Sequence, residues 1–389
     1  MLFPDYHGGS IANLMSSIAQ AMGGWETGYP PLSQLNGERL REVRNLVLLV
    51  VDGLGYRYLK EQAPDSVLFS HCVDSLTSVC PSTTATAIPT FLTGLPPQQH
   101  GLTGWFTYFA ELGCIVTVLP YCTRLGRMPI DERLLSPRQL SGVLPIYDRI
   151  EAQSHLVVPD WIASTSFNRA FSGRATPRPY RGGMSGMFKG IQSAVNAGKG
   201  RNFIYAYWPE FDSLSHEYGV ASGEVARHLD ELDKGFAELL ERLRGTDTQL
   251  LVTADHGFID TTPERTLRLS HHPELAQTLM MPLCGEPRFA FCYVHPDRRE
   301  RFEHYVNEQL SESVTLYPSA QLLQEGRFGL GEAHGRLADR IGHYALIMKK
   351  NYIITSELPG EWPLNHIGVH GGLSSEEMYV PLISLDLTE

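Results

Sequence analysis

The sequence lacks the two features that would place a chain across a membrane. Its longest strongly apolar run, LVLLVV at 46–51, is far shorter than the ~18 residues that span a bilayer. No lysine or arginine precedes Arg39, and no apolar stretch accompanies a basic N-terminus, so the signal-peptide pattern is missing. Without these features, we expect a cytoplasmic protein that has no membrane partner.

The chain also lacks an excess of positive charge. It has 32 Lys and Arg against 43 Asp and Glu, which gives a formal net charge of −11. This balance disfavours a nucleic acid polymer or an anionic membrane as a partner. A small anionic substrate stays compatible with it, because bound cations can reverse the sign of the charge locally.

The cysteines form no C-x-x-C pair. Their positions are Cys72, Cys80, Cys114, Cys122, Cys284 and Cys292. An even number would permit disulfides, but a chain without a signal peptide is expected to keep its thiols reduced.

What the sequence does contain is an alternation of strand and helix patterns. The continuous apolar run 46–51 is typical of a parallel strand covered on both faces. Residues 112–120 and 248–253 predict further buried strands, and 222–244 predict an amphipathic helix. Residues 121–200 predict loops and short helices, because their periodicity is weak. The alternation indicates a doubly wound α/β fold.

Polar clusters follow three of the strand patterns. They are Asp52, then Asp212 with His216, then Asp255 with His256. In doubly wound sheets, sites form outside the carboxyl ends of the strands. Carboxylate and imidazole groups, with His370 of GVHGG in addition, suit zinc, manganese or iron. Each residue alone is more typical of a turn or a structural hydrogen bond, so only their joint occurrence favours a metal site.

The stretch VCPSTTATAIPTFLTGLPPQQHG, residues 79–101, is rich in hydroxyl groups. A hydroxyl is a poor nucleophile near neutral pH unless a base takes its proton or a metal binds the alkoxide. Residues 84–92 have helical spacing, and Gly94 ends the pattern.

Five motifs in order resemble the alkaline phosphatase superfamily, and within it the type I phosphodiesterase/nucleotide pyrophosphatase family. They are VVDGLG, the 81–101 stretch, EFDSLSHEYG, TADHG and GVHGG. The resemblance implies a three-layer α/β/α core with a mostly parallel sheet in a single catalytic domain, 1–389. Its core motifs would lie in 40–120, 200–262 and 356–389, and 262–355 would be an insertion or cap subdomain.

The resemblance also implies a site. Thr84 would be the nucleophile, which attacks phosphodiester or nucleotide pyrophosphate bonds and forms a covalent phospho-enzyme intermediate. Two divalent ions would take part, most simply Zn²⁺, with Mn²⁺ or iron as alternatives. The ligands of one ion would be Asp52, Thr84, Asp255 and His256, and those of the other Asp212, His216 and His370.

One position departs from the family pattern, because Ala87 stands where an asparagine is expected to bind a phosphate oxygen. Another donor must replace it, or the metals and the backbone hold the phosphate. Trp105, Tyr108, Arg124 and Tyr207 are candidate contacts to a small phosphate-ester substrate, although packing of the aromatics and surface solvation of the arginine are the more common roles of such residues.

Two other readings stay open. A phosphomonoesterase, phosphonate hydrolase or phosphosugar mutase could use the same metal site, and so could a non-catalytic binder of phospho-ligands. The complete set of ligands and nucleophile disfavours the binder. No pattern in the sequence predicts the oligomeric state.

Overall fold

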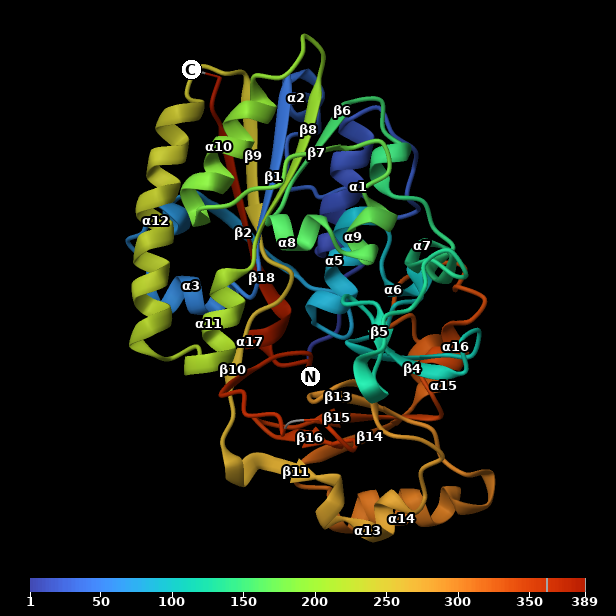
Figure 1. The fold of residues 1–389 in the computed structure, drawn as a ribbon. Helices are drawn as coiled ribbons and strands as arrows, with labels where there is room; N and C mark the ends of the chain where they lie inside the picture. Colours follow the sequence, from blue (N-terminus) through green and yellow to red (C-terminus); the bar gives the residue numbers. More distant parts are fainter. Residues whose placement is uncertain (362, 389) are drawn as a thin grey trace.

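The computed structural model describes residues 1–361 and 363–388 and contains a large, mostly parallel sheet (Figure 1). The strand order is β2-β18-β9-β1-β8-β6-β7. The strands are β1 Asn45–Val51, β2 Cys72–Thr77, β6 Gln153–Val157, β7 Thr176–Pro177, β8 Asn202–Trp208, β9 Thr248–Thr253 and β18 Tyr379–Asp386. β1 pairs in parallel with both β8 and β9, whereas β18 runs antiparallel to β9 and β2. Every residue of β1 is buried, which confirms the predicted covered strand.

Helices cover both faces of this sheet. Figure 1 shows α10 (Gly183–Val195) and α12 (Gly223–Leu243) on one face, with α1 (Ile11–Ala21) and α5 (Thr84–Thr93) on the other. α12 confirms the predicted amphipathic helix, and the Ser222 side chain caps it by accepting from the backbone N–H of Val225. The three-layer α/β/α core is therefore confirmed.

A second, antiparallel sheet lies beyond one end of the core (Figure 1). Its order is β14-β15-β13-β12-β3-β4-β5. The strands are β3 Phe106–Phe109, β4 Cys114–Thr117, β5 Cys122–Thr123, β12 Cys284–Glu286, β13 Phe289–Cys292, β14 Val314–Pro318 and β15 Tyr344–Met348. Residues 262–355 therefore do not form it alone, because three strands come from 106–123. The strand predicted within 112–120 is present as β4, which is half-buried and forms a hairpin with β3 in this second sheet.

Residues 121–200 contain more regular structure than their weak periodicity predicts. β6 is a strand of the main sheet, and α10 is a helix of 13 residues. Glycine is a poor helix former, so the glycine-containing sequence of α10 does not predict a helix. Gly190 lets α10 lie close to β6, since a Cβ there would come within 2.8 Å of a Val157 methyl group.

The remaining elements are short connections and covers. They are α2 Gly37–Glu42, α3 Tyr56–Gln62, α4 Val67–Ser70, α6 Pro97–His100, α7 Pro137–Ser141, α8 Asp160–Ala163, α9 Ser166–Phe171, α11 Glu210–Tyr218, α13 Pro273–Ala276, α14 Arg299–Gln309, α15 Ser319–Gln324, α16 Leu337–Arg340, α17 Ser375–Met378, β10 Ile259–Asp260, β11 Thr266–Arg268, β16 Ile353–Thr355 and β17 Gly368–Val369. Among the described residues, no helix has both the length and the apolar character needed to cross a membrane. All six cysteines have free thiols, as expected.

Candidate metal centre and active site

The carboxyl ends of three parallel strands bring the polar clusters together. Asp52 directly follows β1, Asp255 and His256 follow β9, and α11 after β8 carries Asp212 and His216. β1 lies between β8 and β9, so residues about 200 positions apart in the chain meet at one edge of the sheet. His370 reaches the same place from the loop that follows β17.

The first cluster consists of Asp52, Asp255 and His256. His256 Nε2 lies 3.4 Å from Asp52 Oδ1 and 3.4 Å from Asp255 Oδ2, and these side chains are at most 3% exposed. His256 Nδ1 lies 3.1 Å from the carbonyl oxygen of Gly257. A carbonyl only accepts, so Nδ1 carries the proton and Nε2 presents its lone pair to the cluster.

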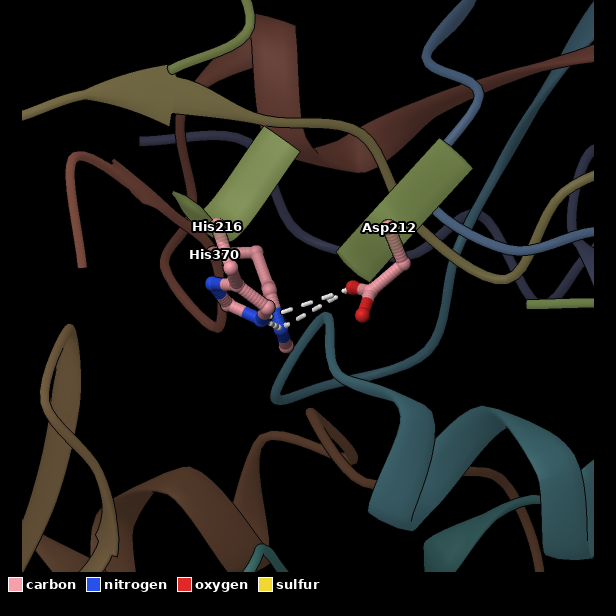
Figure 2. Close-up of side chains that lie close together, drawn as sticks. All are labelled: Asp212, His216 and His370. Atoms are coloured by element: carbon pink, nitrogen blue, oxygen red, sulfur yellow. Dashed lines mark hydrogen bonds and ion pairs between the residues drawn. The ribbon is translucent and has the colours of Figure 1, made fainter. Parts of the chain in front are cut away.

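The second cluster consists of Asp212, His216 and His370. Figure 2 shows the two imidazole rings converging on one oxygen of Asp212. His216 Nε2 and His370 Nε2 lie 3.5 Å and 3.7 Å from Asp212 Oδ1. His216 Nδ1 donates to the Gly368 carbonyl oxygen at 2.9 Å, which leaves Nε2 free to act as a ligand.

The two clusters are adjacent. The rings of His256 and His370, one from each cluster, stack with their centroids 3.7 Å apart. The structure thus brings six of the seven implied ligands together in two groups of three, which match the grouping implied by the family resemblance apart from Thr84.

Each carboxylate of the first cluster has one oxygen fixed and one free. Asp255 Oδ1 accepts from the backbone N–H groups of Gly53 and His256, both at 3.0 Å. Asp52 Oδ2 accepts from the hydroxyl of Tyr207. Among the described residues, the buried Asp52 Oδ1 and Asp255 Oδ2 have no hydrogen-bond donor, and the same holds for Asp212 Oδ1. Buried oxygens without partners are unusual, and here they face the ligand nitrogens.

The electrostatics of the clusters suit cations. Burial, followed by the charges of Asp212 and Asp255, holds the pKa of Asp52 well above its ordinary value. Burial raises the pKa of Asp212 to about 7 and lowers the pKa of His216 to about 4. Burial also lowers the pKa of His370, so both histidines of this cluster are neutral near pH 7. Neutral imidazoles beside crowded carboxylates are the donor set that a divalent cation stabilises, so the residues fit two such ions.

Comparison with known proteins identifies the family. The family model for type I phosphodiesterase / nucleotide pyrophosphatase matches residues 46–373. The chain belongs to this family. It is therefore an enzyme that hydrolyses phosphoric esters, and its family is metal-dependent.

Solved structures share its fold at low identity. Murine ectonucleotide pyrophosphatase/phosphodiesterase 5, as an inactive threonine-to-alanine variant in complex with AMP, is 17% identical with a TM-score of 0.65, covering 88% of each chain. Human ectonucleotide pyrophosphatase/phosphodiesterase 5 is also 17% identical, with a TM-score of 0.64 over 87% of each chain. No curated protein sequence matches the chain.

Thr84 differs from the other hydroxyl residues of this enzyme's 79–101 stretch. It is the first residue of α5, and its Oγ1 lies 3.1 Å from His256 Nε2. Four neighbouring hydroxyls donate instead to backbone carbonyl oxygens at 2.6–2.9 Å, and they are Ser82, Thr86, Thr90 and Thr93. Their protons are already committed within the protein, so Thr84 is the hydroxyl of this group that contacts the first cluster.

A large cavity adjoins both clusters. Its volume is about 1030 Å³, and its lining includes Trp105, Arg124 and Tyr207 of the predicted substrate contacts. Tyr108 is not part of the lining that the described residues form, because it packs edge to face on Tyr293 with the ring centroids 5.5 Å apart. Ala87 is fully buried and is also outside this lining.

Two of the predicted contacts have other partners. Arg124 is 5% exposed, and its Nε and Nη2 donate to Glu361 at 2.9 Å and 3.0 Å. Its Nη1 donates to the Leu283 carbonyl oxygen at 2.7 Å, so its charge and donors are already engaged. Tyr207 donates to Asp52 and thereby orients that carboxylate. Both side chains line the cavity but already have partners within the protein, and their role as substrate contacts stays a prediction.

Three residues around the site escaped the sequence analysis, and they are Arg288, Glu286 and His366. Arg288 forms a buried ion pair with Glu377, which also accepts from the backbone N–H of Gly372 in the His370 loop. Glu286 lines the cavity and accepts from the Trp105 backbone N–H at 2.6 Å, and burial raises its pKa to about 7. His366 lies 4.1 Å from His216 between ring centroids. Only Glu377 carries a local signal, the capping box that begins at Ser374.

Proposed function

We propose that this enzyme cleaves phosphodiester or nucleotide pyrophosphate bonds in small phosphate esters, with Thr84 as the nucleophile. Two divalent ions, most simply Zn²⁺, would be held by the two clusters of three ligands. The observation that carries the proposal is the position of Thr84 Oγ1, 3.1 Å from the ligand nitrogen of His256 at the N-terminus of a 10-residue helix. Backbone N–H groups at such an N-terminus favour the oxygens of a phosphoryl group.

The reaction has two displacements at phosphorus. Thr84 Oγ1 attacks the phosphorus atom in line, and the bond to the leaving alcohol or phosphate breaks. Water then attacks the phosphothreonine, which releases the phosphate monoester and restores the hydroxyl of Thr84. When bound, the two cations supply the positive charge that activates the hydroxyl and the water and stabilises the attacking and leaving oxygens.

The chain's own residues hold this machinery in place. Tyr207 orients Asp52, and the backbone N–H groups of Gly53 and His256 orient Asp255. Hydrogen bonds from surrounding groups to the metal ligands fix the ligand geometry, and their loss commonly weakens metal binding about 10–100-fold. The inactive murine relative has alanine in place of a threonine, which supports a reaction that needs a threonine hydroxyl.

The alternatives differ in the charge of their substrates. A monoesterase or phosphosugar mutase would be expected to place cationic side chains at the site, and the engaged Arg124 does not serve that need. A phosphonate hydrolase would use the same site, and an activity assay distinguishes it from a phosphodiesterase. We also propose a cytoplasmic location, which cell fractionation tests.

The decisive assay compares two chromogenic substrates. Metal content is measured after purification without chelator, and hydrolysis of bis-p-nitrophenyl phosphate is compared with that of p-nitrophenyl phosphate. We expect about two metals per chain, faster turnover of the diester and, in Thr84→Ala, a loss of at least about 1000-fold in kcat. Thr84→Ser keeps a hydroxyl and retains measurable activity. Preference for the monoester would favour a phosphomonoesterase, and full activity in Thr84→Ala would refute the nucleophile.

A further inference from the structure

The cavity beside the clusters extends along one face of α5. Thr84, Ile88 and Leu92 all line it, and they are spaced four residues apart. Residues at this spacing lie above one another on a helix, so the apolar side chains continue directly from the nucleophile. At 1.5 Å of rise per residue, the face from Thr84 to Leu92 is about 12 Å long.

A second part of the cavity wall is apolar as well. It comes from the end of β6 and from α8 and α9, which contribute Val158, Trp161, Ile162 and Phe167. α9 contacts α5, so this wall and the face of α5 approach each other. Phe167 and Leu92 are 4% and 2% exposed, whereas Trp161 is 62% exposed. The apolar space therefore has a buried region and an open rim.

Two polar side chains of the lining are already engaged. Thr165 Oγ1 donates to the Ile162 carbonyl oxygen at 2.9 Å and accepts from the backbone N–H of Asn168 at 3.1 Å. Arg124 is bound to Glu361 and to backbone carbonyls, and it stacks 3.9 Å from the centre of the Phe106 ring. A nucleobase needs donors and acceptors at its edge, and Thr165 and Arg124 do not offer free ones.

We infer that the natural substrate is an amphiphilic phosphodiester, in which one esterified alcohol carries an apolar group that lies along α5 between Ile88 and Ile162. The inference rests on the proposed phosphodiesterase function and names its substrate class. Burial of this group is favourable because each methylene removed from water contributes about 0.8 kcal/mol, which is about fourfold in affinity. The cluster end of the cavity takes the phosphate, and the apolar end selects the alcohol.

The test uses alkyl p-nitrophenyl phosphodiesters of increasing chain length, with the metal-loaded enzyme and with the p-nitrophenyl ester of thymidine 5′-monophosphate as the nucleotide probe. We expect kcat/KM to rise at least 100-fold from the methyl to the octyl ester, with the nucleotide probe slower than the octyl ester. Equal rates for methyl and octyl, or a faster nucleotide probe, would overturn the inference and leave the diesterase function standing.

A pair of variants on one short segment locates the effect. Ile162→Glu places a charge on the cavity wall and lowers the octyl-to-methyl ratio of kcat/KM at least tenfold. Ser164→Glu adds the same charge two residues later, at an exposed position outside the lining, and changes the ratio less than twofold. Equal ratios in the two variants would contradict the assigned wall.

A binding measurement separates the two proposals. Calorimetry compares octylphosphonate with methylphosphonate on the metal-loaded enzyme, and we expect the octyl compound to bind at least 100-fold tighter. If no diester were hydrolysed while this difference persisted, the diesterase function would fall and the apolar site would stand. If the two phosphonates bound equally, the apolar site would fall.

Discussion

The ion pair between Arg288 and Glu377 holds the loop that carries His370. Glu377 accepts from Arg288 Nε at 3.0 Å and from Nη2 at 2.7 Å, and the two side chains are 1% and 0% exposed. Glu377 Oε1 also accepts from the backbone N–H of Gly372 at 2.7 Å. The carboxylate therefore connects the second sheet to a loop only two residues from a proposed metal ligand.

The substitution Glu377→Gln keeps the size of the side chain and an acceptor for Gly372, but it removes the charge. Arg288 is then buried without its counter-charge, and removing one partner of a buried pair costs about 3–5 kcal/mol. The neighbouring Glu376 supplies a matched control, because its pair with Arg57 has side chains that are 43% and 46% exposed. Breaking such an exposed pair costs about 0–1 kcal/mol.

The assay is equilibrium urea unfolding of the metal-free proteins, so that metal binding does not enter the comparison. We expect Glu377→Gln to lower the free energy of unfolding by at least about 2 kcal/mol more than Glu376→Gln does. Zinc titration of the folded variants should show weaker binding at one of two sites in Glu377→Gln only. A difference below about 1 kcal/mol would refute a stabilising role for the buried pair.

Three further outcomes are expected. Tyr207→Phe should weaken metal binding at the Asp52 site about 10–100-fold, measured by competition with a chromogenic chelator, and an effect on substrate KM alone would contradict this. Affinity of the Asp212 site should fall as the pH drops below about 7, since the metal must then displace a proton from Asp212, whereas His216, with a pKa of about 4, stays neutral. Competition titrations between pH 5 and 8 test whether the metal affinity of the Asp212 site falls as the pH drops. Chelation should abolish hydrolysis and added Zn²⁺ should restore it, whereas activity that survived complete metal removal would exclude a metal-dependent reaction.

The proposed ligands Asp52 and Asp255 were predictable because each follows a strand that its own local sequence specifies. The apolar run before Asp52 and the one before Asp255 each predict a buried strand, and parallel strands end at the same edge of a sheet. Their meeting across 200 residues therefore needed no long-range pattern, only the fold class. The family resemblance added the pairing of these residues into two groups.

The partners of the ligands were not predictable in the same way. Tyr207 lies within an apolar strand, where its ring indicates packing, and only the register of β8 beside β1 brings its hydroxyl to Asp52. Arg288 lies between β12 and β13, and no local pattern connects it with Glu377, 89 residues later. The second sheet joins its two chain segments through one residue pair, Gly285 with Phe106, which no periodicity reveals.

The location of Ala87 changes how substrate selection is understood. The missing asparagine suggested that a phosphate-binding donor had been lost, but Ala87 is fully buried and outside the cavity lining formed by the described residues. Ala87 itself therefore presents no group to the cavity. In the proposed mechanism, phosphate binding depends on the two clusters and on the N-terminus of α5, which do not contact the esterified alcohol. Discrimination among phosphodiesters therefore has to come from the walls of the cavity, and Ile88 and Ile162 are apolar.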